Sequence, residues 1–211
     1  DMVETTLSHL FRTKTSLLGG LSFGTALAAD LDNRGLLHSG VRHVVEVGAG
    51  CGDFAAAVLT YIRDNHPTIY EQLDYEILDL APTLRAAQAA TLERAGVQSK
   101  VRWTAQNAET WCPAPESIDL ILSNEVIGDF STVRLTRDLL LLDTTMDLQD
   151  AISRWSPETR SQLGRAGEQI ERYQPALRDA PDSFFFQVGA LDFLANAADA
   201  LRPEGGMYIS E

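Results

Sequence analysis

Short apolar runs alternate with amphipathic or alanine-rich stretches through the middle of the chain. The apolar runs have the length of buried strands, and the stretches between them have helical composition. The runs predicted as strands are 44–47, 74–80, 100–104, 118–123 and 207–211. Helices are predicted from Phe54 onward and over 82–95, so strand and helix alternate. This order predicts an α/β fold with a Rossmann-like parallel sheet and helices on both faces.

Helical spacing also extends to both sides of this core. Two N-terminal helices are predicted at 3–11 and 17–31. After the fourth strand, three more helices are predicted at 135–142, 148–155 and 157–173, the last with Ser156-Pro157-Glu158 as its start signal. The predicted return to the sheet consists of an apolar segment at 183–187, a helix at 190–201 and a turn at 202–206.

The chain has the length of one α/β domain, which we predict to span 1–211. Its predicted parts are N-terminal helices (1–40), a core (41–130), a helical insertion (131–183) and a return to the core (184–211). An insertion of about fifty residues is too long for a bare loop. We predict that it forms a lid over the carboxyl edge of the sheet, which would exclude water from the site. A packing or oligomerisation appendage is the alternative.

Three glycines at alternate positions, Gly48, Gly50 and Gly52, follow the first predicted strand. Glycine is needed where the backbone adopts positive φ or lies directly against a ligand, and strand, glycine turn and helix form the first unit of a nucleotide-binding sheet. Asp53 stands where dinucleotide enzymes have their third glycine, and a carboxylate there would repel a pyrophosphate. This disfavours an NAD-type oxidoreductase. A ligand with cationic groups and no phosphate, such as S-adenosylmethionine (SAM), fits better.

Polar residues stand at the ends of the second and fourth predicted strands. Asp79 ends the second, where an acidic side chain can accept both ribose hydroxyls of a nucleotide. Asn124 and Glu125 end the fourth, at the edge where open α/β sheets bind ligands. Strands one and four are neighbours in the usual order of this fold, so this pair is expected near the glycine loop. The alternatives are a solvated carboxylate at Asp79 and a simple turn after strand four.

The composition of the chain disfavours several classes of binding partner. The net charge of −13 makes a nucleic-acid backbone a poor partner, because its binding needs clustered Lys and Arg. Cys51 and Cys112 supply neither a disulfide framework nor a metal cluster, and no His or Cys spacing indicates a metal. No apolar run has the ~20 residues of a membrane helix, and no signal peptide is visible. We therefore expect a cytoplasmic protein without a membrane partner or a metal.

The segment Val45-Glu-Val-Gly-Ala-Gly-Cys-Gly resembles the first motif of class I SAM-dependent methyltransferases. Together with Leu84-Arg-Ala-x-Gln and Asn124-Glu-Val, it is similar to the MidA-like methyltransferases. That family includes a mitochondrial complex I assembly factor that methylates a protein arginine. The resemblance covers 44–130, and 188–211 shows a weaker similarity. Gly128-Asp-Phe-Ser replaces the segment that usually follows Asn-Glu-Val, and the family's tyrosine-rich N-terminal entry is missing.

The resemblance implies SAM as cofactor and a class I methyltransferase sheet. In that family a polar side chain and a backbone amide after strand three hold the adenine, which points to Asn107 and Ala108. The cofactor-binding residues predicted in this way are Glu46, Gly48, Ala49, Gly50, Gly52, Asp79, Leu80, Asn107, Ala108 and Asn124. For the chemistry we predict Glu125 and Asp129 as base or anionic clamp, with Asn124 orienting cofactor or substrate.

The methyl acceptor stays open at this stage. A small molecule, a carrier-bound acyl group and a protein side chain such as arginine all suit the residues present. A protein that keeps the fold as a binding or assembly module without turnover is the alternative. The full sheet of such enzymes has seven strands, and five are predicted here, so two strands are expected to be missing from this chain. It could therefore be part of a larger polypeptide or a homodimer.

Overall fold

The computed structural model describes residues 11–143 and 146–211. The chain divides into two compact units. The first unit contains the chain up to Val126 and resumes at Asn196–Glu211. The second unit is Ile127–Ala195.

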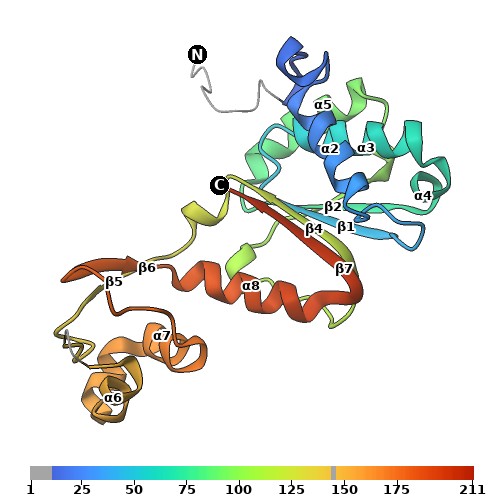
Figure 1. The fold of residues 1–211 in the computed structure, drawn as a ribbon. Coiled ribbons are helices and arrows are strands. Elements are labelled where there is room, and N and C mark those ends of the chain that lie inside the picture. Colours follow the sequence, from blue (N-terminus) through green and yellow to red (C-terminus); the bar gives the residue numbers. More distant parts are fainter. Residues whose placement is uncertain (1–10, 144–145) are drawn as a thin grey trace. The chain divides into compact units, whose positions relative to one another are not determined.

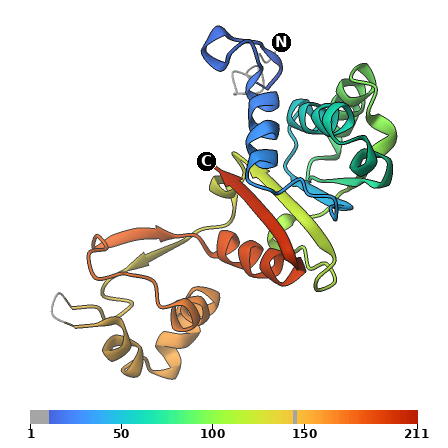
Figure 2. The ribbon, with the colours of Figure 1, turned by 45° about the vertical axis from the view of Figure 1, so that its right-hand side comes forward.

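The first unit is built on a five-stranded sheet with the order β3-β2-β1-β4-β7, in which every pairing is parallel. Its strands are β1 (His43–Val47), β2 (Asp74–Leu78), β3 (Val101–Thr104), β4 (Ile118–Asn124) and β7 (Leu201–Ser210). The predicted parallel α/β sheet is confirmed. So is the expected contact of the first and fourth strands, with Val45 opposite Ile121. In Figure 2, β7, the long red arrow, forms the outer edge beside β4.

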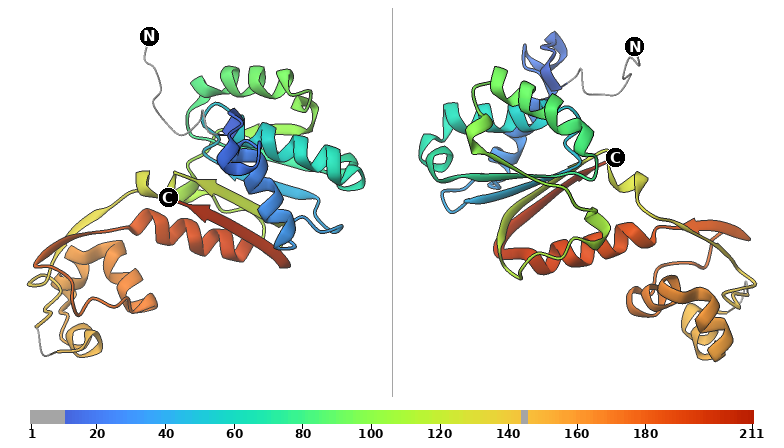
Figure 3. Two further views of the ribbon diagram at one scale, coloured as in Figure 1. Left: turned by 45° about the horizontal axis from the view of Figure 1, so that its top comes forward. Right: turned by 180° about the vertical axis from the view of Figure 1, so that it is seen from behind.

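Of the helices in the described residues, four lie on one face of this sheet (Figures 1 and 3). They are α2 (Phe23–Asn33), α3 (Asp53–Asn65), α4 (Pro67–Gln72) and α5 (Arg85–Arg94). On the opposite face lie the 105–117 segment and the last turn of α8 (Val188–Ala200). Single 3-10 turns complete the unit: η1 (Ser16–Leu18), η2 (Pro82–Leu84), η3 (Gln98–Lys100) and η4 (Ala108–Thr110).

The central strands are apolar because both of their faces are covered. In β4 every residue from Ile118 to Ser123 is buried, and in β1 every residue from Val44 to Val47. Parallel strands covered on both faces have this near-continuous apolar sequence rather than alternation. The buried side chains of β1, β2 and β4 pack with α2 and α3 into one core. This core fixes the ends of the strands, where the polar residues lie.

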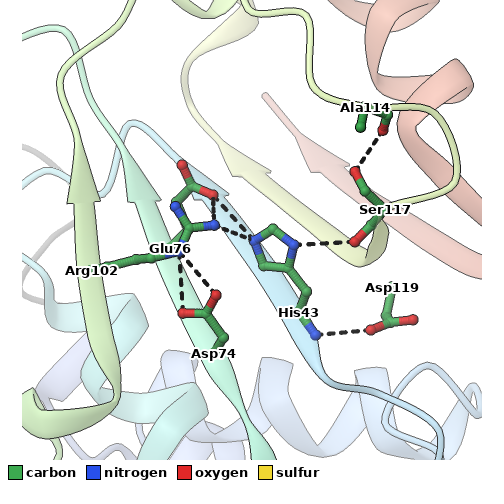
Figure 4. A network of polar contacts seen from close by, with 7 residues as sticks. All are labelled: His43, Asp74, Glu76, Arg102, Ala114, Ser117 and Asp119. Atoms are coloured by element: carbon green, nitrogen blue, oxygen red, sulfur yellow. Dashed lines mark hydrogen bonds and ion pairs between the residues drawn. The ribbon is translucent and has the colours of Figure 1, made fainter.

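A charged network ties together the starts of the strands (Figure 4). His43 Nε2 lies 2.7 Å from Arg102 Nη2 and 3.1 Å from Glu76 Oε2, and Arg102 Nε donates to Asp74 at 2.9 Å. Burial alone would raise the pKa of Glu76. The hydrogen bond from His43 and the Arg102 guanidinium outweigh burial and hold that pKa below its usual range. This amino edge of the sheet is therefore stabilised by opposite charges.

Asp119, the second residue of β4, belongs to the same edge. Its Oδ2 accepts hydrogen bonds from the backbone N–H groups of Arg42 and His43, both at 2.8 Å. Its Oδ1 accepts from Arg202 Nη1 at 2.8 Å. One carboxylate thus fixes the entry of β1 and the bulged start of β7 against β4.

The second unit has its own hydrophobic core. It contains η5 (Ile127–Asp129), an antiparallel ribbon of β5 (Val133–Thr136) and β6 (Ser183–Phe186), the helices α6 (Leu148–Ser153) and α7 (Pro157–Tyr173), and the start of α8. The buried residues of this core include Leu135, Trp155, Leu163 and Ile170. The Oγ of Ser156 accepts from the backbone N–H of Thr159, as the start signal of α7 predicts.

The structure corrects three local predictions. The helix predicted over 135–142 is instead the end of β5 and a turn, because Val133 and Thr136 are β-branched and pair with β6. The insertion is therefore only partly helical. The helix predicted over 17–31 begins at Phe23, because Gly19 and Gly20 adopt positive φ before it.

The third correction concerns 202–206, predicted as a turn. In the structure these residues belong to β7, where the register against β4 shifts between Ile118 and Leu120. The Pro-Glu-Gly-Gly sequence makes a bulge in a strand rather than a connection before one. The helix predicted at 3–11 lies almost wholly outside the described residues.

Candidate functional site

The ends of β1, β2 and β4 meet at the carboxyl edge of the sheet, and the glycine loop after β1 is packed tightly there. Gly48 has φ +66°, and a Cβ at this position would lie 2.6 Å from the Val126 side chain. Gly52 has φ +84°, and its Cβ would lie 3.1 Å from the Cα of Gln88. A Cβ on Gly50, with φ +51°, would meet nothing within 4 Å. The loop is thus held from two sides and open at its middle, as a loop that receives a ligand must be.

Glu46, the fourth residue of β1, has its carboxyl group buried beside this loop. The hydroxyl of Tyr75, on β2, donates to Glu46 Oε2 at 2.6 Å. Burial raises the pKa of Glu46 to about 7, the Tyr75 bond opposes the rise, and the charge of Asp79 adds to it. Its only hydrogen-bond partner identified in the described residues is an uncharged donor.

Asp79 follows β2, as predicted, and is half-buried. Its Oδ1 accepts from the backbone N–H of Ala81 at 2.9 Å, and its Oδ2 accepts from Gln88 Nε2 at 2.9 Å. A carboxylate has about four acceptor positions, so each oxygen retains capacity for one more donor. Two hydroxyl groups, such as those of a ribose, match this spare capacity.

The predicted adenine-binding residues lie after β3. Asn107 caps η4, because its side-chain oxygen accepts from the backbone N–H of Glu109 at 2.9 Å. Ala108 is buried, whereas Leu80, after Asp79, is 66% exposed. The backbone N–H of Asp79 donates to the carbonyl of Thr104 at 3.1 Å, which joins the ends of β2 and β3. Asp79, Leu80 and the 105–108 loop therefore start from neighbouring strand ends.

The end of β4 is held by β7. Ser210 Oγ donates to Asn124 Oδ1 at 2.6 Å, and the backbone N–H of Glu125 donates to the carbonyl of Ser210 at 2.8 Å. Glu125 is exposed and has φ +56°, a left-handed conformation that is strained for a residue with a side chain. Val126, the next residue, contacts Gly48. The strain thus falls on the residue predicted to act in the chemistry, next to the glycine loop.

Asp129 differs from the other predicted site residues. It is exposed in the single turn η5 of the second unit, whereas Glu46, Asp79, Asn107, Asn124 and Glu125 all belong to the first. The sequence placed it only four residues beyond Glu125, and the unit boundary falls between the two. Its predicted role in the chemistry stays a prediction.

Sequence reasoning gave no role to three residues that hold this edge together: Tyr75, Gln88 and Ser210. Gln88 did stand in the Leu84-Arg-Ala-x-Gln motif, and a polar residue in an alanine-rich helix face was a usable signal. Glu46 in an apolar strand requires a donor on a neighbouring strand, because a buried carboxyl without a hydrogen bond is costly. Tyr75 is that donor.

The ligand class can be tested against these residues. Asp53, the first residue of α3, has a buried side chain with Arg12 Nη1 at 3.9 Å. Its carboxylate occupies the helix N-terminus at which a dinucleotide fold binds pyrophosphate. Glu46 and Asp79 add acidic groups held by uncharged donors. The site therefore fits a nucleoside with cationic groups and no phosphate, as SAM is. In the described residues, no group of three His, Cys, Asp or Glu side chains could hold a metal.

Comparison with family models decides the family. Residues 33–209 match the model of a family described as "Putative S-adenosyl-L-methionine-dependent methyltransferase". The chain belongs to this family. Its cofactor is SAM, and the predicted membership of the SAM-dependent methyltransferases is confirmed. No curated protein sequence matches the chain.

Two solved structures from Burkholderia thailandensis are similar to this chain. One, an uncharacterised protein, is 29% identical with TM-score 0.46, over 63% of this chain and 31% of its own. The other, bound to S-adenosylhomocysteine, is 31% identical with TM-score 0.44, over 55% and 28%. The matched part thus spans less than a third of either protein. The trans-methyltransferase CalH, with S-adenosylhomocysteine, has TM-score 0.50 at 14% identity, over 99% of this chain and 40% of its own, and shares the fold.

No helix among the described residues is both long and apolar enough to cross a membrane.

Proposed function

We propose that the protein transfers the methyl group of SAM to a guanidinium nitrogen, with Glu125 holding the acceptor. The observation that carries this proposal is the charge of the carboxyl edge. Glu46 and Asp79 accept hydrogen bonds from Tyr75, Ala81 and Gln88, all uncharged donors, and Glu125 is exposed. Asp79 and Glu125 therefore supply the negative charge that this edge can offer to a cation, since burial favours the protonated form of Glu46. The similarity to MidA-like methyltransferases, with their protein-arginine substrate, supports the same acceptor class.

The glycine loop, Asp79 and the 105–108 loop would hold the cofactor. When bound, SAM supplies an electrophilic methyl group on a positively charged sulfur that becomes a neutral thioether. Glu125 would dock the guanidinium through charge-assisted hydrogen bonds and receive the proton that the methylated nitrogen loses. Asn124, fixed by Ser210, would orient the acceptor beside the loop. Alignment and exclusion of water are the main tasks of such a site, because the methyl group is already activated.

We also propose that the second unit selects the acceptor and covers the site as a lid. It begins two residues after Glu125 and has its own core, which supports a separable role. Replacing 131–183 by a short glycine-serine linker should abolish turnover and leave SAM affinity within about tenfold, ~1.4 kcal/mol. Unchanged methylation rates in this variant would show instead that the unit is a packing or oligomerisation element. We also propose a cytoplasmic location, because a chain with two cysteines and no disulfide framework suits a reducing compartment.

The test of the acceptor uses methyl-labelled SAM and matched acceptors. An arginine-containing peptide, the same peptide with citrulline, free arginine and an acyl carrier would be compared, and products identified by mass spectrometry. We expect label on the arginine peptide and none on citrulline, which has the same shape without the charge. Label on free arginine alone would assign a small-molecule substrate of the same chemistry. Transfer only to the carrier would overturn the guanidinium proposal, and tight SAM binding with no transfer would favour a non-catalytic module.

A further inference from the structure

Gln88, on α5, joins three parts of the first unit through one buried side chain. It is 1% exposed. Its Nε2 donates to the carbonyl oxygen of Gly50 at 3.0 Å and to Asp79 Oδ2 at 2.9 Å, and its Oε1 accepts from Trp103 Nε1 at 3.0 Å. Both protons of the amide nitrogen are therefore used. One side chain links the glycine loop, the end of β2 and the strand β3.

The orientation of this amide follows from its partners. The indole Nε1 of Trp103 can only donate, so the oxygen of the Gln88 amide must face it. The amide nitrogen then faces two acceptors, the carbonyl of Gly50 and the carboxylate of Asp79. A flipped amide would place its oxygen against both acceptors and its nitrogen against a donor. The three contacts thus specify a single orientation.

The backbone of Gln88 makes a second contact with the loop. A Cβ on Gly52 would lie 3.1 Å from the Cα of Gln88 and 3.4 Å from its carbonyl oxygen, so only glycine allows this approach. Helix α5 therefore holds the loop at Gly50 through a hydrogen bond and at Gly52 through close packing. Gln88 thus contacts the loop at two points and Asp79 at a third.

We propose that Gln88 is the positioning residue that sets the distance between the glycine loop and the Asp79 carboxylate, and thereby the affinity for SAM. This inference rests on the assignment of Asp79 to the ribose. The loop and Asp79 would hold different parts of one cofactor, so their separation must match its length. Gln88 does not need to touch the cofactor. Its Nε2 occupies one acceptor position of Asp79 Oδ2, and the second position can still accept from a ligand hydroxyl.

The test measures binding of SAM and S-adenosylhomocysteine by calorimetry, with melting curves of the unliganded protein. Gln88→Met keeps the length of the side chain and removes its hydrogen bonds. We expect it to weaken both ligands at least tenfold. The matched control is Thr91→Val. Thr91 is another buried polar residue of α5, and its hydroxyl accepts a hydrogen bond from Arg94 rather than bonding to the loop or to Asp79. The control variant should lower the melting temperature and leave affinity unchanged.

A double-variant cycle separates positioning from plain stability. If Gln88 acts through Asp79, adding Gln88→Met to Asp79→Asn should lower SAM affinity by less than a further threefold. Gln88→Glu supplies a pH readout, since it places a second carboxylate beside Asp79. Its SAM affinity should be lower at pH 8 than at pH 6, whereas the wild-type profile should change less over this range.

The outcomes distinguish the inference from its basis. Normal affinity in Gln88→Met, with Asp79→Asn weakened, would overturn the role of Gln88 and keep the ribose assignment. The role of Gln88 would also be overturned if the two losses of SAM affinity multiplied in the double variant. Normal affinity in Asp79→Asn would instead remove the ribose assignment itself. A lowered melting temperature with normal affinity would leave Gln88 a structural residue only.

Discussion

The two edges of the sheet hold their acidic residues in opposite ways. At the amino edge, Glu76 faces His43 and Asp74 faces Arg102 (Figure 4). Asp119, at the same edge, faces Arg202. At the carboxyl edge, Glu46 and Asp79 accept from a tyrosine hydroxyl, a glutamine amide and a backbone N–H. Opposite charges neutralise the first group, which then serves the fold. Uncharged donors orient the second group without an opposing charge. The carboxylate of Asp79 can therefore still attract a cationic ligand, whereas burial favours the protonated form of Glu46.

The pKa values follow the same division. Burial would raise the pKa of Glu76, but His43 and Arg102 hold it below its usual range. The pKa of Asp119 is likewise held low against burial, by the backbone N–H groups of His43 and Arg42 and by Arg202. The pKa of Glu46 is raised to about 7, because burial exceeds the effect of its hydrogen bond from Tyr75. Groups with shifted pKa values are found more often in functional sites than elsewhere in a protein. Glu46 has one uncharged donor against its burial, whereas Glu76 and Asp119 each have several donors, an arginine among them.

The largest effect is expected at Glu125. Glu125→Gln keeps the shape and removes the charge, so kcat should fall at least ~10²-fold, the lower end for a general base. SAM affinity should change much less. Steady-state kinetics and a melting curve on this variant test the prediction. A normal kcat with a lowered melting temperature would show that Glu125 serves stability only. The acidic residues of both edges would then serve the fold.

The next largest effect is expected on cofactor binding at Asp79. Asp79→Ala removes the predicted acceptor of two hydroxyl groups, each worth ~1.5–3 kcal/mol when bonded to a charged group. SAM affinity measured by calorimetry should therefore fall by at least about 10²-fold. Asp74→Ala, at the start of the same strand, is the matched control and should leave affinity unchanged. Unaltered binding in Asp79→Ala, or tighter binding of NADH than of SAM, would contradict the assignment.

Asp119 should show the reverse pattern. Asp119→Ala leaves the backbone N–H groups of Arg42 and His43 and the Arg202 guanidinium without their acceptor. The free energy of unfolding should fall by about 3 kcal/mol, as when a buried pair loses one partner. Denaturant unfolding measures this loss, and SAM affinity per folded molecule should not change. Because the pKa of Asp119 is lowered, its contribution to stability is present at neutral pH and disappears as the pH falls through the folded-state pKa.

A pH dependence of stability, at most as large as the effect at Asp119, is expected at Glu46. A carboxyl group whose pKa rises from 4.5 to about 7 on folding binds its proton more tightly in the folded state. Its contribution to stability is therefore full at low pH and decreases as the pH rises from about 4.5 through about 7, by at most about 3 kcal/mol. Glu46→Gln keeps an acceptor for Tyr75 and should flatten this part of the profile. Unfolding curves at pH 5, 6, 7 and 8 check it, and an unchanged slope would show that Glu46 is ionised throughout.

The sequence by itself determined the parallel sheet, its strand ends and the glycine loop. Strands β1, β2 and β4 lie where the apolar runs predicted them, because residues buried on both faces must be apolar along their whole length. The glycines at 48, 50 and 52 were readable because backbone with positive φ, or packed against a neighbour, excludes other side chains. Such local constraints leave a pattern in the chain itself.

Only the tertiary structure decided which polar groups are joined. Gln88 meets Gly50 and Asp79 because α5 packs beside the loop, and Tyr75 meets Glu46 because β1 and β2 pair in one register. The strand β5 depended on β6, a partner about fifty residues away, so local helical spacing around Leu135 misled. Contacts between distant segments depend on packing geometry, and spacing along the chain carries no signal for them.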